Sequence, residues 1–252
     1  DVARLEDELK RIEQLSRSVV SLPSRTPTFC PGCPHRDSAS VMKDLAGDFE
    51  NEAYMQSHHN CSSQDVVFHG DIGCYVMLKY DPYKRLMHNL SGMGLGGGTG
   101  AGIDPFIDNK QVVFMGDSTF FHSGMAAISD SIKNGQNITY VILDNKTTAM
   151  TGHQPTPGQE VDVMGRATAA QDIERIVRAM GAGRSPASSV SVVRLNPEQQ
   201  KRYREVVEQT VLRPGVKVIV ADKECAITAG RRQRAERRET IAELGFLPRE
   251  QH

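Results

Sequence analysis

The sequence predicts an α/β protein built on a doubly wound, mostly parallel sheet. Short apolar runs rich in β-branched residues, such as 112–115, 138–143 and 216–221, alternate with helical patterns. Such runs are typical of strands that are buried on both faces, and the helices that connect parallel strands cover both faces of the sheet. The length of 252 residues suits one sizeable domain of this class or a little more.

The first residues predict an amphipathic helix over 3–19, because apolar side chains recur at helical spacing and charged ones fill the other face. This helix either docks on the domain or links it to a domain upstream. The first residue, Asp1 rather than Met, suggests a processed product, an excised domain or a fragment. We assign residues 1–25 to this linker helix, 26–228 to the main domain and 229–252 to a charged C-terminal helix or linker. The apolar positions are Leu5, Leu9, Ile12, Leu15 and Val19.

The main domain is predicted to alternate regularly between strands and helices. Four prolines between residues 23 and 34 keep its first segment extended. Residues 91–102 are rich in glycine, and their place before the strand at 112–115 favours close approach of the backbone to a cofactor over a flexible linker. The predicted elements are strand 66–73, strand 112–115, helix 122–133, strand 138–143, helix 172–180, strand 190–194, helix 198–211 and strand 216–221.

Two of these strands are followed by oxygen-bearing side chains. Asp117 comes directly after strand 112–115 and Gly116, and Asn145 follows strand 138–143, 28 residues further on. Parallel strands end along one edge of the sheet, where α/β proteins bind ligands. A carboxylate and an amide oxygen there can share a hard cation such as Mg²⁺, which typically bridges to phosphates. The simpler interpretation is a pair of ordinary strand-end turns, in which Asp and Asn are common.

The pair resembles the signature of thiamine-diphosphate-binding proteins, which opens with Gly-Asp-Gly and closes with Asn-Asn. The resemblance implies a sheet of the pyrophosphate-binding (PP) type. It also implies Mg²⁺ held by Asp117, Asn145 and the backbone carbonyl of Thr147. Two positions depart from the pattern, Ser118 for the second Gly and Asp144 for the first Asn, and neither replaces an implied metal ligand.

The cysteines form a second constellation. Cys30 and Cys33 make a Cys-x-x-Cys pair, and Cys74 and Cys225 each follow a strand-like stretch. Four thiolates on strand ends and loops can bind an iron–sulfur cluster or a tetrahedral Zn²⁺, and spacing alone does not choose between them. Taken alone, Cys225 could also be a small buried apolar residue.

The order of the motifs resembles the 2-oxoacid:ferredoxin oxidoreductases, most closely the thiamine-diphosphate-binding part of the large subunit of the indolepyruvate-type members. The match runs from about residue 28 to about residue 232. It rests on Cys-Pro-Gly-Cys-Pro-His from Cys30, Gly-Asp-Ile-Gly-Cys-Tyr from Gly70, Gly-Asp-Ser-Thr-Phe-Phe-His-Ser-Gly from Gly116 and Leu-Asp-Asn-Lys-Thr-Thr-Ala-Met-Thr-Gly-His-Gln-Pro from Leu143.

The resemblance implies two sets of site residues. A [4Fe-4S] cluster would be bound by Cys30, Cys33, Cys74 and Cys225. Cys61 competes with Cys74, which we prefer because the family pattern places this ligand after a strand and a glycine. Thiamine diphosphate would be contacted by Gly116, Asp117, Ser118, Asn145, Thr147, His35, Gly73, Met93 and Gly94.

The implied activity is oxidative decarboxylation of an aryl 2-oxoacid, such as indolepyruvate, to an acyl-CoA, with electrons passed through the cluster to ferredoxin. This chain would supply the diphosphate and Mg²⁺ half of the site. The catalytic residues stay unassigned, because the activating Glu is expected on a missing pyrimidine-binding domain. We expect an oligomer with that domain and a smaller subunit. The alternatives are a non-redox thiamine-diphosphate decarboxylase or carboligase and a structural Zn-binding interaction module.

Composition limits the other partners. The formal net charge is −1, and nothing indicates binding to nucleic acid. No apolar stretch is long enough to span a bilayer, and no secretory signal opens the sequence. The odd number of cysteines, arranged for a cluster, argues for a reducing compartment. We therefore expect a cytoplasmic enzyme that binds neither nucleic acid nor membrane.

Overall fold

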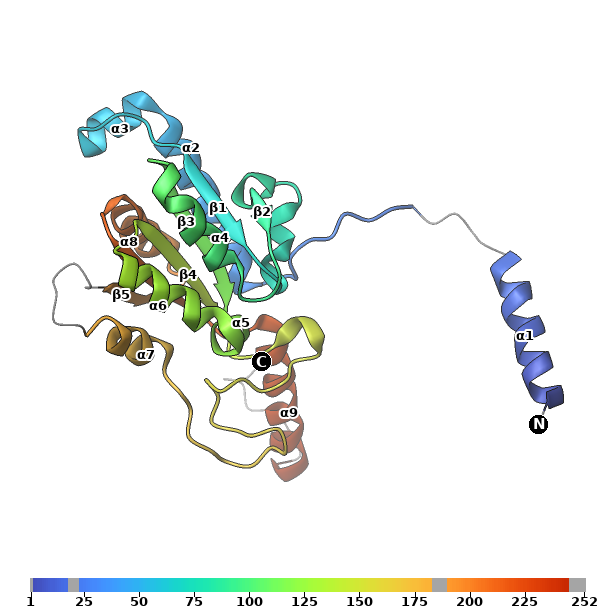
Figure 1. Ribbon diagram of the computed structural model, residues 1–252. Coiled ribbons are helices and arrows are strands. Elements are labelled where there is room, and N and C mark those ends of the chain that lie inside the picture. Colours follow the sequence, from blue (N-terminus) through green and yellow to red (C-terminus); the bar gives the residue numbers. More distant parts are fainter. Residues whose placement is uncertain (1, 18–22, 183–189, 245–252) are drawn as a thin grey trace.

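Six strands form a single sheet in the computed structural model, which describes residues 2–17, 23–182 and 190–244 (Figure 1). The strand order is β2-β1-β3-β4-β6-β5, and every neighbouring pair is parallel. The predicted α/β fold is therefore confirmed. The strands are β1 Val66–Gly70, β2 Asn89–Leu90, β3 Lys110–Gly116, β4 Ile138–Asp144, β5 Val190–Leu195 and β6 Val216–Asp222.

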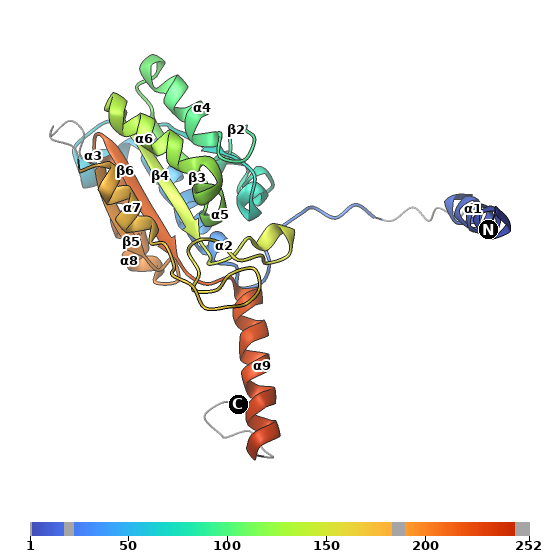
Figure 2. The same cartoon turned by 60° about the horizontal axis from the view of Figure 1, so that its bottom comes forward.

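Helices connect these strands and cover the sheet on both sides (Figures 1 and 2). They are α1 Val2–Arg17, α2 Pro34–Glu50, α3 Glu52–His59, α4 Gly96–Ile103, α5 Asp117–Thr119, α6 Met125–Asn134, α7 Ile173–Met180, α8 Gln200–Leu212 and α9 Ala226–Leu244.

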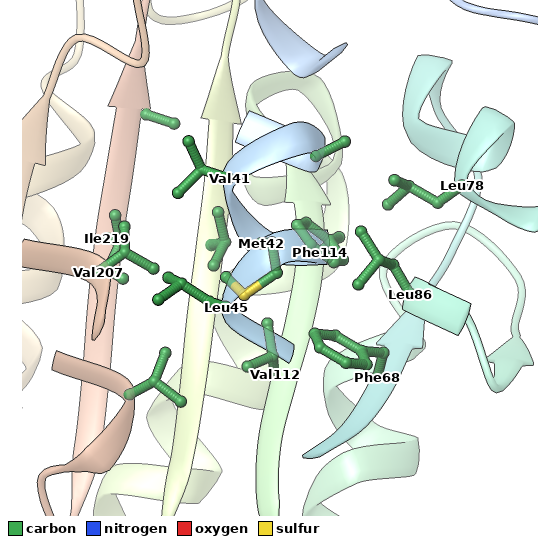
Figure 3. Packing of buried hydrophobic residues seen from close by; sticks show 14 of the residues in the cluster. Val41, Met42, Leu45, Phe68, Leu78, Leu86, Val112, Phe114, Val207 and Ile219 are labelled. Atoms are coloured by element: carbon green, nitrogen blue, oxygen red, sulfur yellow. The ribbon is translucent and has the colours of Figure 1, made fainter. Parts of the chain in front are cut away.

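Apolar side chains form a core on each face of the sheet. Alternate residues of a strand point to opposite faces, so Val112 and Phe114 of β3 join one core, while Val113 and Met115 join the other. Helices α2 and α8 cover the first face, and α4, α6 and α7 cover the second. Figure 3 shows the first core, in which Leu45 of α2 lies against the strands. This double cover is the doubly wound arrangement that the sequence predicts.

The order of the strands changes direction at β1. Strand β2 pairs with one edge of β1, and β3 pairs with the other edge. The connections that leave the carboxyl ends of β1 and β3 therefore run to opposite sides. In open α/β sheets such a point is where ligands bind, so the segments after Gly70 and Gly116 are the expected location of a site.

Two element boundaries differ from the prediction by more than two residues. The strand-like stretch 66–73 ends at Gly70, because the following residues turn into a short 3₁₀ helix, Cys74–Lys79. The helix expected from residue 122 begins at Asp117, five residues earlier, and passes through one π-helical segment, Phe120–Gly124, before α6. Segments of π-helix are rare and frequently mark functional sites.

One prediction for the first half of the domain is wrong. Pro34 does not continue the extended segment. It is the first residue of α2, where the fixed φ of proline suits a helix start. From Gly96 onward the glycine-rich segment forms α4, a helix that the sequence did not predict. Its glycines let that helix approach the sheet, since a Cβ on Gly100 would lie 2.8 Å from Cδ1 of Ile138.

Replacing Gly97 by alanine is expected to lower the free energy of unfolding by about 1–3 kcal/mol. The new Cβ would lie 2.7 Å from Cβ of Ala127 and 2.8 Å from Cε1 of Tyr140. Gly98→Ala is the matched control, because its Cβ meets nothing within 4 Å and alanine stabilises a helix by roughly 0.5–1 kcal/mol over glycine. Urea unfolding measures both. Equal stability of the two variants would contradict the packing role of Gly97.

Helices α1 and α9 contribute no buried residue to the domain. Figures 1 and 2 both show α1 apart from the sheet and α9 extending from its carboxyl edge. Helix α1 lies within the predicted linker segment, and Val19 lies outside the described residues, so the boundaries 1–25, 26–228 and 229–252 stay predictions. Within the described residues, no helix combines the length and apolar character needed to cross a membrane.

Candidate cofactor site and cysteine cavity

Asp117 and Asn145 lie close together at the carboxyl edge of the sheet. Asp117 follows β3 directly, and Asn145 follows β4, which pairs with β3. The backbone N–H of Thr147 donates to Asp117 Oδ2 at 3.0 Å and to Asn145 Oδ1 at 3.3 Å. Because one N–H contacts both oxygens, the two oxygens face the same small volume, as a shared cation would require.

A cavity of about 200 Å³ opens beside this pair. Its walls come from the ends of β1, β3 and β4 and from the start of α2. Of the nine predicted cofactor residues, only Gly94 lies outside the lining, where its backbone N–H donates to Asp71 Oδ2 at 3.2 Å. The predicted residues that line the cavity are His35, Gly73, Met93, Gly116, Asp117, Ser118, Asn145 and Thr147.

The electrostatics of Asp117 fit a cation. Burial, with the nearby charge of Asp144 as a second cause, raises the pKa of the Asp117 carboxyl to about 7. Within the described part of the chain, no Lys or Arg forms an ion pair with it. A buried carboxylate, an amide oxygen and the nearby carbonyl of Thr147 are all hard oxygen ligands. This donor set suits Mg²⁺, which would stabilise the ionised carboxylate.

The raised pKa predicts how the stability of the metal-free protein changes with pH. Asp117 holds its proton more tightly in the folded chain than in the unfolded chain, so its contribution to the free energy of unfolding is full below about pH 4. That contribution falls as the pH rises to about 7, by on the order of 4 kcal/mol. Asp117→Asn should make the decline shallower. Urea unfolding in a chelator at several pH values tests this, and parallel slopes for the two proteins would contradict it.

A buried hydrogen-bond network beside the cavity was not predicted from the sequence. The Tyr75 hydroxyl donates to Asp71 Oδ1 and lies 3.2 Å from Oγ1 of Thr119. Asp71 is fully buried, and burial raises the pKa of its carboxyl to about 6. The network joins the turn after β1 to the helix start after β3. Its sequence signal is the Gly70-Asp71 pair at the end of β1, which repeats the Gly116-Asp117 pair at the end of β3.

A second cavity, of about 290 Å³, is lined by the four predicted cluster cysteines. Cys30 and Cys33 flank a tight turn before α2, Cys74 begins the 3₁₀ helix after β1, and Cys225 directly precedes α9. The structure thus brings together thiols from three distant parts of the sequence. Cys61 is not among the lining residues and packs against the core under α2.

The thiols influence one another electrostatically. The pKa of Cys74 is raised to about 11, mainly by burial and then by the charges of Cys33, Cys225 and Cys30 in that order. Burial also raises the pKa of Cys33, while hydrogen bonds from the backbone of Arg36 and His35 lower it. Within the described residues, no three His, Cys, Asp or Glu side chains surround a point that could hold one metal ion.

The two cavities share a wall. His35, Cys74, Asn145, Ala149 and Met150 line both of them. The backbone N–H of Cys225 donates to the carbonyl oxygen of Asn145 at 3.0 Å, so this cysteine is bound to the loop that follows β4. A group in the cysteine cavity would lie directly beside a group in the first cavity.

The fold and the first cavity define a protein that binds a phosphorylated cofactor at the carboxyl edge of a parallel sheet. The family described as "Thiamine pyrophosphate enzyme, C-terminal TPP binding domain" matches residues 71–221, which include the turn after β1 and all of β3 and β4. The chain belongs to this family of thiamine-diphosphate-binding domains.

Curated relatives are similar over most of the chain. The protein named "Indolepyruvate oxidoreductase subunit IorA" from Methanothermobacter thermautotrophicus is 36% identical over 212 residues, which are 84% of this chain and 31% of the relative. The protein of the same name from Archaeoglobus fulgidus is 32% identical over 225 residues, or 89% and 33% of the two chains. The chain thus spans about a third of the length of these relatives.

Solved structures share the fold. A 2-oxoglutarate:ferredoxin oxidoreductase from Magnetococcus marinus superposes with a TM-score of 0.63 at 18% identity and covers 82% of this chain and 66% of its own. A thiamin diphosphate-dependent enzyme isolated from Mycobacterium smegmatis gives a TM-score of 0.50 at 16% identity, covering 74% and 31%. At these identities the likeness shows the fold.

Proposed function

We propose that this chain is the cofactor-binding part of an enzyme that oxidatively decarboxylates an aryl 2-oxoacid, such as indolepyruvate, to an acyl-CoA and passes the electrons to ferredoxin. The observation that carries the proposal is the shared wall between the two cavities. It would place a redox group in contact with the thiamine site, an arrangement that a non-redox thiamine enzyme does not need. The relatives named indolepyruvate oxidoreductase support the substrate class.

In this proposal Asp117, Asn145 and the carbonyl of Thr147 hold Mg²⁺ against the diphosphate. Gly116 and Ser118 would border the diphosphate, while Gly73, Met93 and Gly94 would border the rest of the cofactor, and all but Gly94 line the same cavity. The bound thiamine diphosphate would supply the electron sink for decarboxylation. The protein would contribute the buried, preformed oxygen ligands and a wall that excludes water.

Cys30, Cys33, Cys74 and Cys225 would hold a [4Fe-4S] cluster. The cavity of about 290 Å³ suits a group of several atoms. A structural Zn²⁺ would instead need the four thiolates at about 2.3 Å from one point. Electron transfer from the thiamine site would then cross the wall formed by Cys74.

The proposed enzyme needs parts outside this chain. Neither cavity is lined by a described Glu that could activate the aminopyrimidine, and the relatives are about three times as long. We propose that a pyrimidine-binding domain and a smaller subunit of the same oligomeric enzyme complete the site. CoA and ferredoxin would bind to that assembly.

The test is metal analysis of the anaerobically purified chain, combined with titration calorimetry of thiamine diphosphate in Mg²⁺. We expect about four iron and four sulfide per chain, broad visible absorption, and Mg²⁺-dependent binding of the cofactor. A colourless, iron-free protein that binds the cofactor would favour a non-redox decarboxylase or carboligase. One equivalent of zinc without cofactor binding would favour a structural zinc module.

A further inference from the structure

We infer that His35 is a positioning residue that orients the side-chain amide of Asn145 toward the metal site, rather than a direct contact to the diphosphate. The inference rests on the proposed function, because it assigns Asn145 as a Mg²⁺ ligand. Both side chains are almost completely buried, at 4% exposure each. His35 Nε2 lies 3.2 Å from Asn145 Nδ2, and this is the hydrogen bond that the imidazole makes in the described structure.

The orientation of the Asn145 amide follows from its two opposite neighbours. The backbone N–H of Thr147 can only donate, so the atom 3.3 Å from it is the amide oxygen, Oδ1. The NH₂ group therefore points the other way, to His35, and donates to Nε2. The proton of the imidazole must then be on Nδ1. In this arrangement Oδ1 faces the side of Asp117, where the cation would bind.

The reverse orientation of the amide would cost metal affinity. It would turn the NH₂ group of Asn145 toward a cation and toward the N–H of Thr147. It would also place Oδ1 against His35 Nε2, which can donate to it only if the imidazole proton moves from Nδ1 to Nε2. Groups in the outer shell that orient metal ligands typically matter by 10–100-fold in affinity when they are removed. His35 is well placed for this role, because Cys33 and Pro34 fix it at the buried start of α2.

The same contact links the two cavities. His35 is the second residue of α2, two positions after Cys33, and it lines the cysteine cavity as well as the cofactor cavity. Asn145 is therefore held by its side chain from the Cys30–Cys33 turn and by its backbone carbonyl from Cys225. The loop that carries Asn145 is therefore positioned by the start of α2, next to Cys33, and by Cys225.

A double-mutant cycle tests the inference on the full chain. The readout is the Mg²⁺ concentration that gives half-maximal binding of thiamine diphosphate by calorimetry, with iron content and melting temperature measured for each variant. His35→Met replaces the imidazole nitrogen by a thioether, which is only a weak acceptor, and should raise that concentration by about tenfold or more. His35→Gln keeps an acceptor near the position of Nε2 and should stay within about threefold of the wild type.

Asn145→Asp provides the decisive background. A carboxylate presents an oxygen in either orientation, so His35→Met should change the Mg²⁺ requirement by less than about twofold when residue 145 is Asp. An equal effect in both backgrounds would overturn the inference in favour of a direct diphosphate contact. A His35→Met protein that binds like the wild type, or a His35→Gln protein that is folded and equally impaired, would also overturn it. Failure of the wild-type chain to bind the cofactor in Mg²⁺ would instead overturn the proposed function, and the inference with it.

Discussion

Replacing Asp117 by alanine is expected to weaken the binding of thiamine diphosphate in Mg²⁺ by at least about tenfold, or 1.4 kcal/mol. Asp117 is the charged member of the proposed ligand set, and its Oδ2 faces the same backbone N–H as Oδ1 of Asn145. Without it, the protein would offer the cation only neutral oxygens. Titration calorimetry at fixed Mg²⁺ measures the loss, and an unchanged affinity would remove Asp117 from the metal site.

Stability separates a ligand from a structural residue at this position. The Asp117 carboxyl is buried and has its pKa raised to about 7, so its ionised form destabilises the metal-free fold. Asp117→Asn should therefore unfold at a urea concentration at least as high as the wild type in a chelator at neutral pH. It should nevertheless bind the cofactor poorly. Asp130→Ala, on the exposed face of α6, is the control that should change neither property. A marked loss of stability in Asp117→Asn would point to a structural role.

The ends of the strands could be predicted because they depend on residues that are close together in the sequence. Short β-branched runs bounded by turn residues favour buried strands, and parallel strands end at one edge, so Asp117 and Asn145 were expected near one another. Asp71 was within reach of the same reasoning, since it follows Gly70 as Asp117 follows Gly116. The helix α4 in the glycine-rich segment was not predicted, because glycine is a poor helix former. This helix is fixed by tertiary packing on the sheet instead.

Contacts between distant segments could not be derived from residue patterns. His35 and Asn145 are 110 positions apart, and their hydrogen bond depends on how the start of α2 meets the loop after β4. The convergence of the cysteines likewise depends on the place where α9 begins, since a Cβ on Gly32 would lie 3.4 Å from Cβ of Ala226. Their placement after strands and in loops suggested one set but did not choose between a cluster and Zn²⁺, and only the resemblance to a known family indicated a [4Fe-4S] cluster. The four thiols line one cavity.

The assignment of Cys74 rather than Cys61 as a cluster ligand predicts a large loss of iron. Cys74→Ser is expected to remove most of the iron and to bleach the broad visible absorption, because a serine hydroxyl is a poor substitute for a thiolate ligand of iron. Cys74 lines the cavity that also holds Cys30, Cys33 and Cys225. It lies on the wall that faces the cofactor cavity, so no other described cysteine can replace it there.

Cys61→Ser is the matched control, with the same chemical change at a thiol of similar partial burial. Cys61 packs against the apolar core beneath α2, so a hydroxyl there should cost only a modest part of the free energy of unfolding, about 1 kcal/mol. Iron content and the visible spectrum should stay at the wild-type level. Iron and sulfide analysis of both variants, purified without oxygen, decides the matter. Loss of iron from Cys61→Ser with retention in Cys74→Ser would reverse the ligand assignment, and with it the proposal that the cluster contacts the cofactor through Cys74.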